Sequence, residues 1–253
     1  MSKETMKRLK ACVVVPSYNN GATLVEVLEG IAAECADVIV VVDGSTDDTR
    51  ERLQALSLSL DVIYFATNQG KGEALKAGFR RAAERGFRYA VTIDSDGQHY
   101  PSDIPRLVEA VESRPGALVV GSRGMRHDNM PGGNSFANRF SNFWFAVHTW
   151  RRLPDTQTGF RLYPLRFASR QQWLTSRYEA ELELLVMAAW RGIELVPVAV
   201  RVYYPPAEER VSHFRPVYDF ARISLLNTVL CAIALVYGYP RMIYNKVVKL
   251  LKK

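Results

Sequence analysis

Residues 88–99, RYAVTIDSDGQH, contain the transition on which the predicted fold rests. A mostly apolar run, 88–93, ends abruptly at Asp94-Ser95-Asp96-Gly97, as a buried strand does when it reaches a polar turn. The same transition recurs in further runs that we expect to be strands, at 11–16, 38–42, 61–66 and 118–121. Segments that we expect to be helices lie between these runs. One covers residues 22–34, a second begins near Thr46, and a third is opened by residues 68–72 and runs through Arg85. This alternation predicts an α/β fold, a mostly parallel sheet with helices on both faces.

The second half of the chain is less regular and ends in a segment of different character. We expect helices over 135–150 and 179–191 and a strand over 194–202. Residues 223–239 carry no charge, and a basic cluster follows them: Arg241, Lys246, Lys249, Lys252 and Lys253. As a helix the uncharged run would be about 25 Å long, short of the roughly 30 Å hydrocarbon core of a bilayer. We therefore predict one α/β domain, 1–215, and a helical tail, 216–253, that associates with a membrane surface.

Composition and charge narrow the classes of protein. The 253 residues are 48% hydrophobic and 23% charged, which indicates a folded globular chain, and the net charge of +7 predicts anionic partners. The basic residues are dispersed and accompany no recognition motif, so we do not expect nucleic acid among these partners. The widely spaced Cys12, Cys35 and Cys231 predict neither a zinc site nor a disulfide framework, and no apolar leader core is visible. We expect a cytoplasmic protein, peripheral or monotopic at the inner face of the membrane.

Asp94 and Asp96 are the first candidates for chemistry. In a parallel sheet the carboxyl ends of the strands meet at one edge, where ligands bind, and the turns after these strands place Asp43 and Lys71 there as well. Two carboxylates one residue apart repel each other, and a divalent cation relieves that repulsion and can bridge to a diphosphate. Gln98 offers a further hard oxygen ligand. The alternative interpretation is that both aspartates only shape a turn or cap a helix.

Six segments occur in an order and at spacings that resemble the motifs of family 2 glycosyltransferases, and most closely the dolichyl- and polyprenyl-phosphate sugar transferases. They are Val14-Val15-Pro16-Ser17-Tyr18-Asn19, Val42-Asp43-Gly44-Ser45-Thr46-Asp47, Asn68-Gln69-Gly70-Lys71-Gly72, Asp94-Ser95-Asp96-Gly97-Gln98-His99, Gly121-Ser122-Arg123 and Asp155-Thr156-Gln157-Thr158-Gly159-Phe160-Arg161. The resemblance covers residues 11 to 203 and implies a GT-A fold (a Rossmann-like sheet), a nucleotide-diphosphate sugar as donor, and Mg²⁺ or Mn²⁺ as cofactor. The P-loop spacing and a GxGxxG turn after the first strand are both missing, which argues against an ATPase and a Rossmann dehydrogenase.

On the donor side, the resemblance assigns positions for the nucleotide, the diphosphate and the metal. The positions that match the donor site are Pro16, Tyr18, Asn19, Asp43, Lys71 and Asp94. The positions that match the metal site are Asp94, Asp96 and Gln98. Asp96 is also a catalytic candidate, since a metal held there would stabilise the departing diphosphate. For Lys71 the alternative is a solvated lysine at the start of a helix.

On the acceptor side, the resemblance points to charged residues of the second half. For a hydroxyl acceptor, Glu181 is the preferred general base and Glu179 is held in reserve, whereas a lipid phosphate would need no strong base. The alternative for both glutamates is the solvated face of a helix. The arginines that match acceptor-binding positions are Arg123, Arg139 and Arg161.

Two further assignments concern Asp155 and the segment 209–215. Asp155 belongs to the catalytic candidates as a residue that positions other groups. The alternative is that it forms an ion pair with Arg151 or Arg152 and has no other role. Relatives carry a basic loop at 209–215 that closes over the donor diphosphate, and here Arg210 or Arg215 is a candidate for the charge.

These assignments predict a metal-dependent inverting glycosyltransferase that moves a sugar to a polyprenyl phosphate or another membrane lipid. Two alternatives stay open. One keeps the fold but uses a soluble or glycan hydroxyl acceptor, and it makes Glu181 essential. The other is a non-catalytic protein that binds nucleotide sugars. The apolar tail could also mediate a homo-oligomer instead of a membrane contact.

Overall fold

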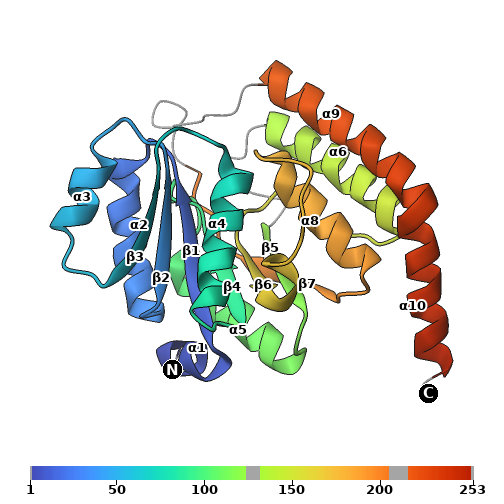
Figure 1. The fold of residues 1–253 in the computed structure, drawn as a ribbon, viewed down its shortest axis with the longest axis horizontal. Helices are drawn as coiled ribbons and strands as arrows, with labels where there is room; N and C mark the ends of the chain where they lie inside the picture. The colour runs from blue at the N-terminus through green and yellow to red at the C-terminus, as the bar shows by residue number, and fades with distance from the viewer. Residues whose placement is uncertain (1, 124–131, 205–215, 252–253) are drawn as a thin grey trace.

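The computed structural model describes residues 2–123, 132–204 and 216–251. These residues form a seven-stranded sheet in the order β3-β2-β1-β4-β6-β5-β7 (Figure 1). The strands are β1 Ala11–Ser17, β2 Val38–Asp43, β3 Leu60–Phe65, β4 Tyr89–Thr92, β5 Leu118–Arg123, β6 Arg161–Pro164 and β7 Leu195–Val200. Within this sheet β6 runs antiparallel to β4 and β5, and the other pairings are parallel. The predicted mostly parallel α/β fold is confirmed.

Helices cover both faces of the sheet. They are α1 Ser2–Leu9, α2 Gly21–Glu34, α3 Thr49–Ala55, α4 Lys71–Glu84, α5 Ile104–Ser113, α6 Gly132–Thr149, α7 Leu165–Ala168, α8 Glu179–Trp190, α9 Pro216–Ile233 and α10 Tyr239–Leu251. A 3₁₀ turn, Pro101–Asp103, precedes α5, and a π-helical turn, Ala234–Gly238, joins α9 to α10. Buried side chains of α1, α2, α3 and α5 lie on one face, and those of α4, α6, α7, α8 and α9 on the other. The chain therefore folds as three layers, helix–sheet–helix.

The central strands contain continuous apolar runs because both of their faces are buried. Along β1, Cys12 and Val14 enter the core shared with α4 and α8, whereas Val13 and Val15 enter the core shared with α2 and α5. This alternation follows from the period of two in an extended chain.

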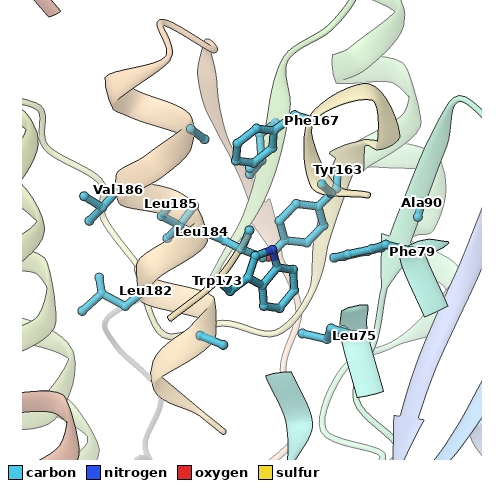
Figure 2. Packing of buried hydrophobic residues seen from close by; sticks show 14 of the residues in the cluster. Leu75, Phe79, Ala90, Tyr163, Phe167, Trp173, Leu182, Leu184, Leu185 and Val186 are labelled. Carbon is cyan, nitrogen blue, oxygen red and sulfur yellow. The ribbon is translucent and has the colours of Figure 1, made fainter. Parts of the chain in front are cut away.

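The core under α8 is built around aromatic side chains (Figure 2). Phe79 of α4 lies with its ring centroid 5.0 Å from that of Tyr163 in β6 and 6.1 Å from that of Trp173. Leu182 and Leu185 of α8 belong to the same cluster. This packing fixes α8 relative to α4, which matters because both helices begin at the site described below.

Strand β6 is not among the strands that the sequence predicts. A strand of four residues is too short to show a period of its own, and its place is set by partners distant in sequence. Leu162 pairs with Val91 of β4 on one side and with Val119 of β5 on the other. Because β6 reverses direction, it brings the 155–160 turn to the carboxyl end of β4.

The helices α9 and α10 form an arm along the outside of α6 and α8 (Figure 1). The side chains of Leu226, Leu230 and Ala234 are 3%, 0% and 0% exposed, so one side of this arm is part of the core. The stretch Ala221–Leu251 is long and apolar enough to cross a membrane by length and composition, a criterion that a helix packed inside a protein also meets. The division of the chain after residue 215 stays a prediction.

Candidate active site

The loops after β1, β2 and β4 are tied together at the carboxyl edge of the sheet. Asn19 has a φ of 51°; its Oδ1 accepts a hydrogen bond from the Thr46 backbone N–H at 2.8 Å, and its own backbone N–H donates to Ser45 Oγ at 3.0 Å. Asn20 Nδ2 donates to Ser95 Oγ at 3.1 Å. Because β2 and β4 lie on opposite sides of β1, this edge is a topological switch point, where open α/β sheets bind ligands.

Asp43, the last residue of β2, fixes the turn that leads into α4. Its two carboxylate oxygens accept hydrogen bonds from the backbone N–H groups of Gln69 and Gly70 at 2.7 and 2.8 Å. Gly70 has a φ of +101°, and a Cβ there would collide with the carbonyl oxygen of Ser176, so the turn requires glycine. By fixing this turn, Asp43 sets the position of Lys71, the first residue of α4. A contact of Asp43 with the nucleotide stays a prediction.

Lys71 lies between two carboxylates that come from distant parts of the chain. Its Nζ is 2.7 Å from Asp94 Oδ1 and 2.8 Å from Glu181 Oε2, and its side chain is only 15% exposed. Gly159 closes over this group, since a Cβ there would collide with Asp94 Oδ2 and lie 2.8 Å from Lys71 Nζ. The hydroxyl of Thr92 donates to the Gly159 carbonyl at 2.7 Å and holds the turn in place. The interpretation of Lys71 as a solvated lysine is therefore wrong.

The close charges shift the pKa values of this group. Burial alone would lower the pKa of Lys71, but Asp94 and Glu181 outweigh it and raise that pKa above its ordinary value. Burial tends to raise the pKa of Asp94, and the Lys71 ammonium lowers it below its ordinary value. Burial and the negative charge of Asp94 together raise the pKa of Asp96 to about 6. Asp96 thus experiences the like-charge repulsion that a bound cation would relieve.

The aspartates offer a donor set that fits a hard divalent cation. Asp94 and Asp96 are half-buried at the turn after β4, and Asp96 Oδ1 accepts a hydrogen bond from the Gln98 backbone N–H at 3.0 Å. In the part of the chain that the structure describes, no group of three or more His, Cys, Asp or Glu is placed to hold a metal. A cation at these carboxylates would therefore complete its oxygen ligands from Gln98, water or a bound diphosphate.

Glu181 and Glu179 both lie in the first turn of α8. They are 6% and 4% exposed, so their interpretation as a solvated helix face is wrong. The carbonyl of Glu181 accepts a hydrogen bond from Arg161 Nη1 at 2.7 Å. Arg161 is fully buried and also donates to the Thr156 carbonyl at 2.9 Å and to the Tyr163 hydroxyl at 3.0 Å. In this arrangement Arg161 holds the 155–160 turn against α8; its contact with an acceptor stays a prediction.

Arg123 and Asp155 form a buried ion pair beside this turn. Arg123 Nε is 2.6 Å from Asp155 Oδ2, and Nη2 donates to Oδ1 at 3.0 Å. Burial would raise the pKa of Asp155, but the Arg123 guanidinium holds it below its usual range. Asp155 therefore pairs with Arg123, not with Arg151 or Arg152 as the alternative had it. Arg139 is exposed on α6, and the acceptor roles of both arginines stay predictions.

Comparison with known proteins identifies the family. The family model for glycosyl transferase family 2 matches residues 12–178, more than half of the chain. This chain belongs to glycosyl transferase family 2. The glycosyltransferase is 30% identical over 203 residues to the undecaprenyl-phosphate mannosyltransferase of Micrococcus luteus. The alignment covers 76% of this chain and 83% of that relative. It is 27% identical over 214 residues to the UDP-N-acetylglucosamine–dolichyl-phosphate N-acetylglucosaminyltransferase of Methanococcus voltae, covering 76% of this chain and 85% of that relative.

A solved structure agrees with the fold of this glycosyltransferase. It is the glucosyl-3-phosphoglycerate synthase of Mycobacterium tuberculosis in complex with Mn²⁺, UDP and glucosyl-3-phosphoglycerate. The TM-score is 0.68 with 22% sequence identity, and the alignment covers 92% of this chain and 82% of that chain. The predicted GT-A architecture is confirmed.

The structure brings several of the predicted site residues together, through contacts that the sequence did not predict. Pro16 lies within β1 and Tyr18 directly follows it, at the same edge as Asp43. Gly159 belongs to a motif that the sequence had singled out, yet its packing against Asp94 and Lys71 depends on the unpredicted strand β6. The expected basic loop at 209–215, with Arg210 and Arg215, lies outside the described residues.

Proposed function

We propose that this family 2 glycosyltransferase moves a sugar from a nucleotide-diphosphate donor to a polyprenyl phosphate in a reaction that requires a divalent cation. The observation that carries the proposal is the contact of Lys71 with Asp94 and Glu181 at the switch point of the sheet. It places a buried cation between the predicted metal ligand and the predicted acceptor-side carboxylate. The two relatives named as polyprenyl- and dolichyl-phosphate sugar transferases support the class of acceptor.

On the donor side, Asp94, Asp96 and Gln98 would hold Mg²⁺ or Mn²⁺. When bound, such an ion stabilises the negative charge that develops on the departing nucleotide diphosphate. Lys71 contributes a second positive charge beside Asp94, in a position to attract the diphosphate. Pro16, Tyr18, Asn19 and Asp43 would hold the nucleotide along the loops after β1 and β2.

On the acceptor side, the attacking oxygen decides what Glu181 has to do. A phosphate monoester with a second pKa near 6 is already an anion at neutral pH, so it needs no proton acceptor. Glu181 is held by Lys71 and by its helix, which suits a carboxylate that orients the reacting groups. Direct attack of the acceptor oxygen on the anomeric carbon inverts its configuration, and the anomeric form of the product tests this step.

We also propose that the arm of α9 and α10 lies in the plane of a membrane surface. Exposed apolar side chains on this arm include the following set, which we call the outer tail face: Leu225, Val229, Leu235, Val236, Ile243, Tyr244, Val247, Leu250 and Leu251. Exposed basic residues accompany it: Arg241, Lys246 and Lys249. Because the opposite side of α9 is buried against α6 and α8, lipid cannot surround this helix while the fold stays intact. Exposed apolar side chains with basic residues near them suit the interface of an anionic bilayer.

A donor screen tests the proposed reaction. The full chain is incubated with UDP-, GDP- and other nucleotide sugars and a polyprenyl phosphate in anionic vesicles, with Mn²⁺, with Mg²⁺ or with EDTA. We expect cation-dependent release of one nucleoside diphosphate, with the sugar recovered in the lipid phase as an acid-labile phosphodiester. Free polyprenol serves as the matched acceptor control, because it offers a hydroxyl in place of the phosphate.

The other outcomes discriminate between the alternatives. Sugar that remains in water, or transfer to the free alcohol, contradicts a phosphate acceptor and supports a hydroxyl acceptor. Binding of a donor without release of its nucleoside diphosphate contradicts catalysis and supports a protein that only binds nucleotide sugars. Equal turnover in EDTA contradicts the requirement for a cation.

A further inference from the structure

Three glutamates at the start of α8 connect this helix to three different regions of the molecule. Glu181 binds Lys71 at the candidate active site, at 2.8 Å. Glu183 accepts hydrogen bonds from the backbone N–H groups of Leu174 and Thr175 in the preceding loop, at 2.7 and 3.0 Å. Glu179 binds neither of these regions and instead pairs with the C-terminal arm.

The partner of Glu179 is Arg222 of α9. Arg222 Nε lies 3.2 Å from Glu179 Oε1, with the glutamate side chain 4% exposed and the arginine side chain 45% exposed. Glu179 Oε2 is buried and has no hydrogen-bond partner among the described residues. Arg222 is the last charged residue before the uncharged run 223–239. Because the Glu179 carboxylate is buried, removal of the half-exposed Arg222 would leave its charge without this partner.

The first turn of α8 has no space to move without disturbing the active site. Ala180, between the two glutamates, faces α4 so closely that a Cβ on Gly72 would lie 2.7 Å from its own Cβ. The backbone N–H of Glu73 donates to the Ser176 carbonyl at 3.2 Å, which joins α4 to the loop just before α8. A shift of Glu179 therefore moves Glu181 relative to Lys71, because interiors packed at this density transmit displacements.

We propose that Arg222 is a positioning residue whose ion pair with Glu179 couples the seating of the membrane-binding arm to the position of Glu181. The proposal deepens the proposed function and rests on it, since it gives the arm a second task besides attachment. An arm seated on a vesicle holds Arg222 in place, and Arg222 holds the turn that carries Glu181. The catalytic centre is then fully assembled at the membrane surface, where the lipid acceptor is found.

Kinetics of matched arginine variants test the coupling. We expect Arg222→Gln to lower kcat about tenfold with the KM for the donor unchanged, and to lose most of the stimulation by anionic vesicles. Arg222→Lys keeps a positive charge at this place and should retain most of the wild-type rate. Arg114→Gln is the control, because it removes the same charge from an exposed ion pair, with Glu194 at 3.4 Å, outside both the arm and the site. It should leave both kcat and the stimulation by vesicles unchanged.

A double-mutant cycle shows whether Arg222 acts through Glu179. If it does, Glu179→Gln combined with Arg222→Gln is no slower than Glu179→Gln alone. Additive losses in kcat, or an Arg222→Gln enzyme as fast as the wild type, overturn the proposal. A near-complete loss in Glu179→Gln with little effect of Arg222→Gln assigns Glu179 itself to the chemistry and also overturns it.

Hydrogen exchange provides a readout that does not depend on transfer. Addition of anionic vesicles to the wild-type chain should slow amide exchange both in α9 and in residues 179–183, and in Arg222→Gln only in α9. Exchange at 179–183 that is indifferent to vesicles in the wild type overturns the coupling, whether or not sugar is transferred. Absence of transfer in a protein that shows the exchange response refutes the proposed reaction and leaves the coupling supported.

Discussion

The candidate active site and the outer tail face depart from ordinary burial in opposite ways. At the site, charged side chains such as Lys71 and Glu181 are buried and paired with one another. On the outer tail face, large apolar side chains such as Leu235 and Val236 are 69% and 80% exposed. Buried charges and exposed apolar patches are the informative exceptions to the usual distribution. Lys71 and Glu181 pair with each other within the chain, whereas the side chains of the outer tail face are exposed to the surroundings.

Among these tests, we expect the largest effect from Asp96→Asn, which tests the candidate active site. It keeps the shape of the turn but removes one of the two charges that would hold the cation. We expect kcat to fall by about 10²–10³, because preorganised electrostatic stabilisation of the departing diphosphate is lost. Steady-state kinetics give the rate, and titration calorimetry with Mn²⁺ should show a weaker metal affinity.

Asp37→Asn is the control for Asp96→Asn. Asp37 immediately precedes β2, at the opposite end of the sheet strands from Asp94, and pairs with Arg85 at 3.2 Å. This variant should keep the wild-type kcat and metal affinity. An Asp96→Asn enzyme that still responds to Mn²⁺ as the wild type does would refute the metal site.

Gly159→Ala tests whether the close packing of the site matters for turnover. The added Cβ collides with Asp94 Oδ2 and crowds Lys71 Nζ. A displacement of reacting groups by about 1 Å costs about 10² in rate, and we expect a fall in kcat of up to that size. The control is Gly86→Ala, where the φ of +80° makes the substitution costly but no atom lies within 4 Å. The control should melt earlier yet keep its kcat per folded molecule; equal effects of the two variants on kcat would contradict the packing argument.

The double variant Leu235→Ser with Val236→Ser tests the other side of the contrast. Both side chains are exposed, so the fold should tolerate their replacement, whereas a bilayer would lose apolar contact with them. At about 1.5–3 kcal/mol for a fully buried side chain, the affinity for anionic vesicles should fall by about tenfold or more. Flotation with vesicles measures the binding.

The control is Leu174→Ser, at a leucine that is 63% exposed and lies outside the arm; this variant should bind vesicles as the wild type does. An unchanged flotation of the double variant would favour a homo-oligomer contact, which analytical ultracentrifugation would then reveal.

The same contrast explains what the sequence could predict. The strands of the first half were predictable because β1 and β2 are buried on both faces and end in polar turns, and Asp94, Asp96 and Lys71 follow from those turns. Strand β6 was not, because its four residues are placed by pairing with β4 and β5 rather than by a pattern of their own. The alternation of Glu179 and Glu181 resembled a solvated helix face, and only the positions of Arg222 and Lys71 show why both are buried. The outer tail face was predictable as apolar, but which side of α9 packs on α8 depends on tertiary contacts.

The smallest expected effect concerns His148, on α6 where the arm meets the globular part. His148 is fully buried, its Nε2 lies 3.1 Å from Asn227 Oδ1 of α9, and burial lowers its pKa below the ordinary 6.5. Between that lowered pKa and 6.5 the unfolded chain binds more protons than the folded one, so acidification through this range destabilises the fold. The melting temperature should therefore fall by a few degrees more between pH 7 and pH 5.5 in the wild type than in His148→Gln, a variant that cannot titrate. An equal fall in melting temperature for the two proteins would contradict this expectation. It would show that the contact between α6 and α9 tolerates a protonated His148.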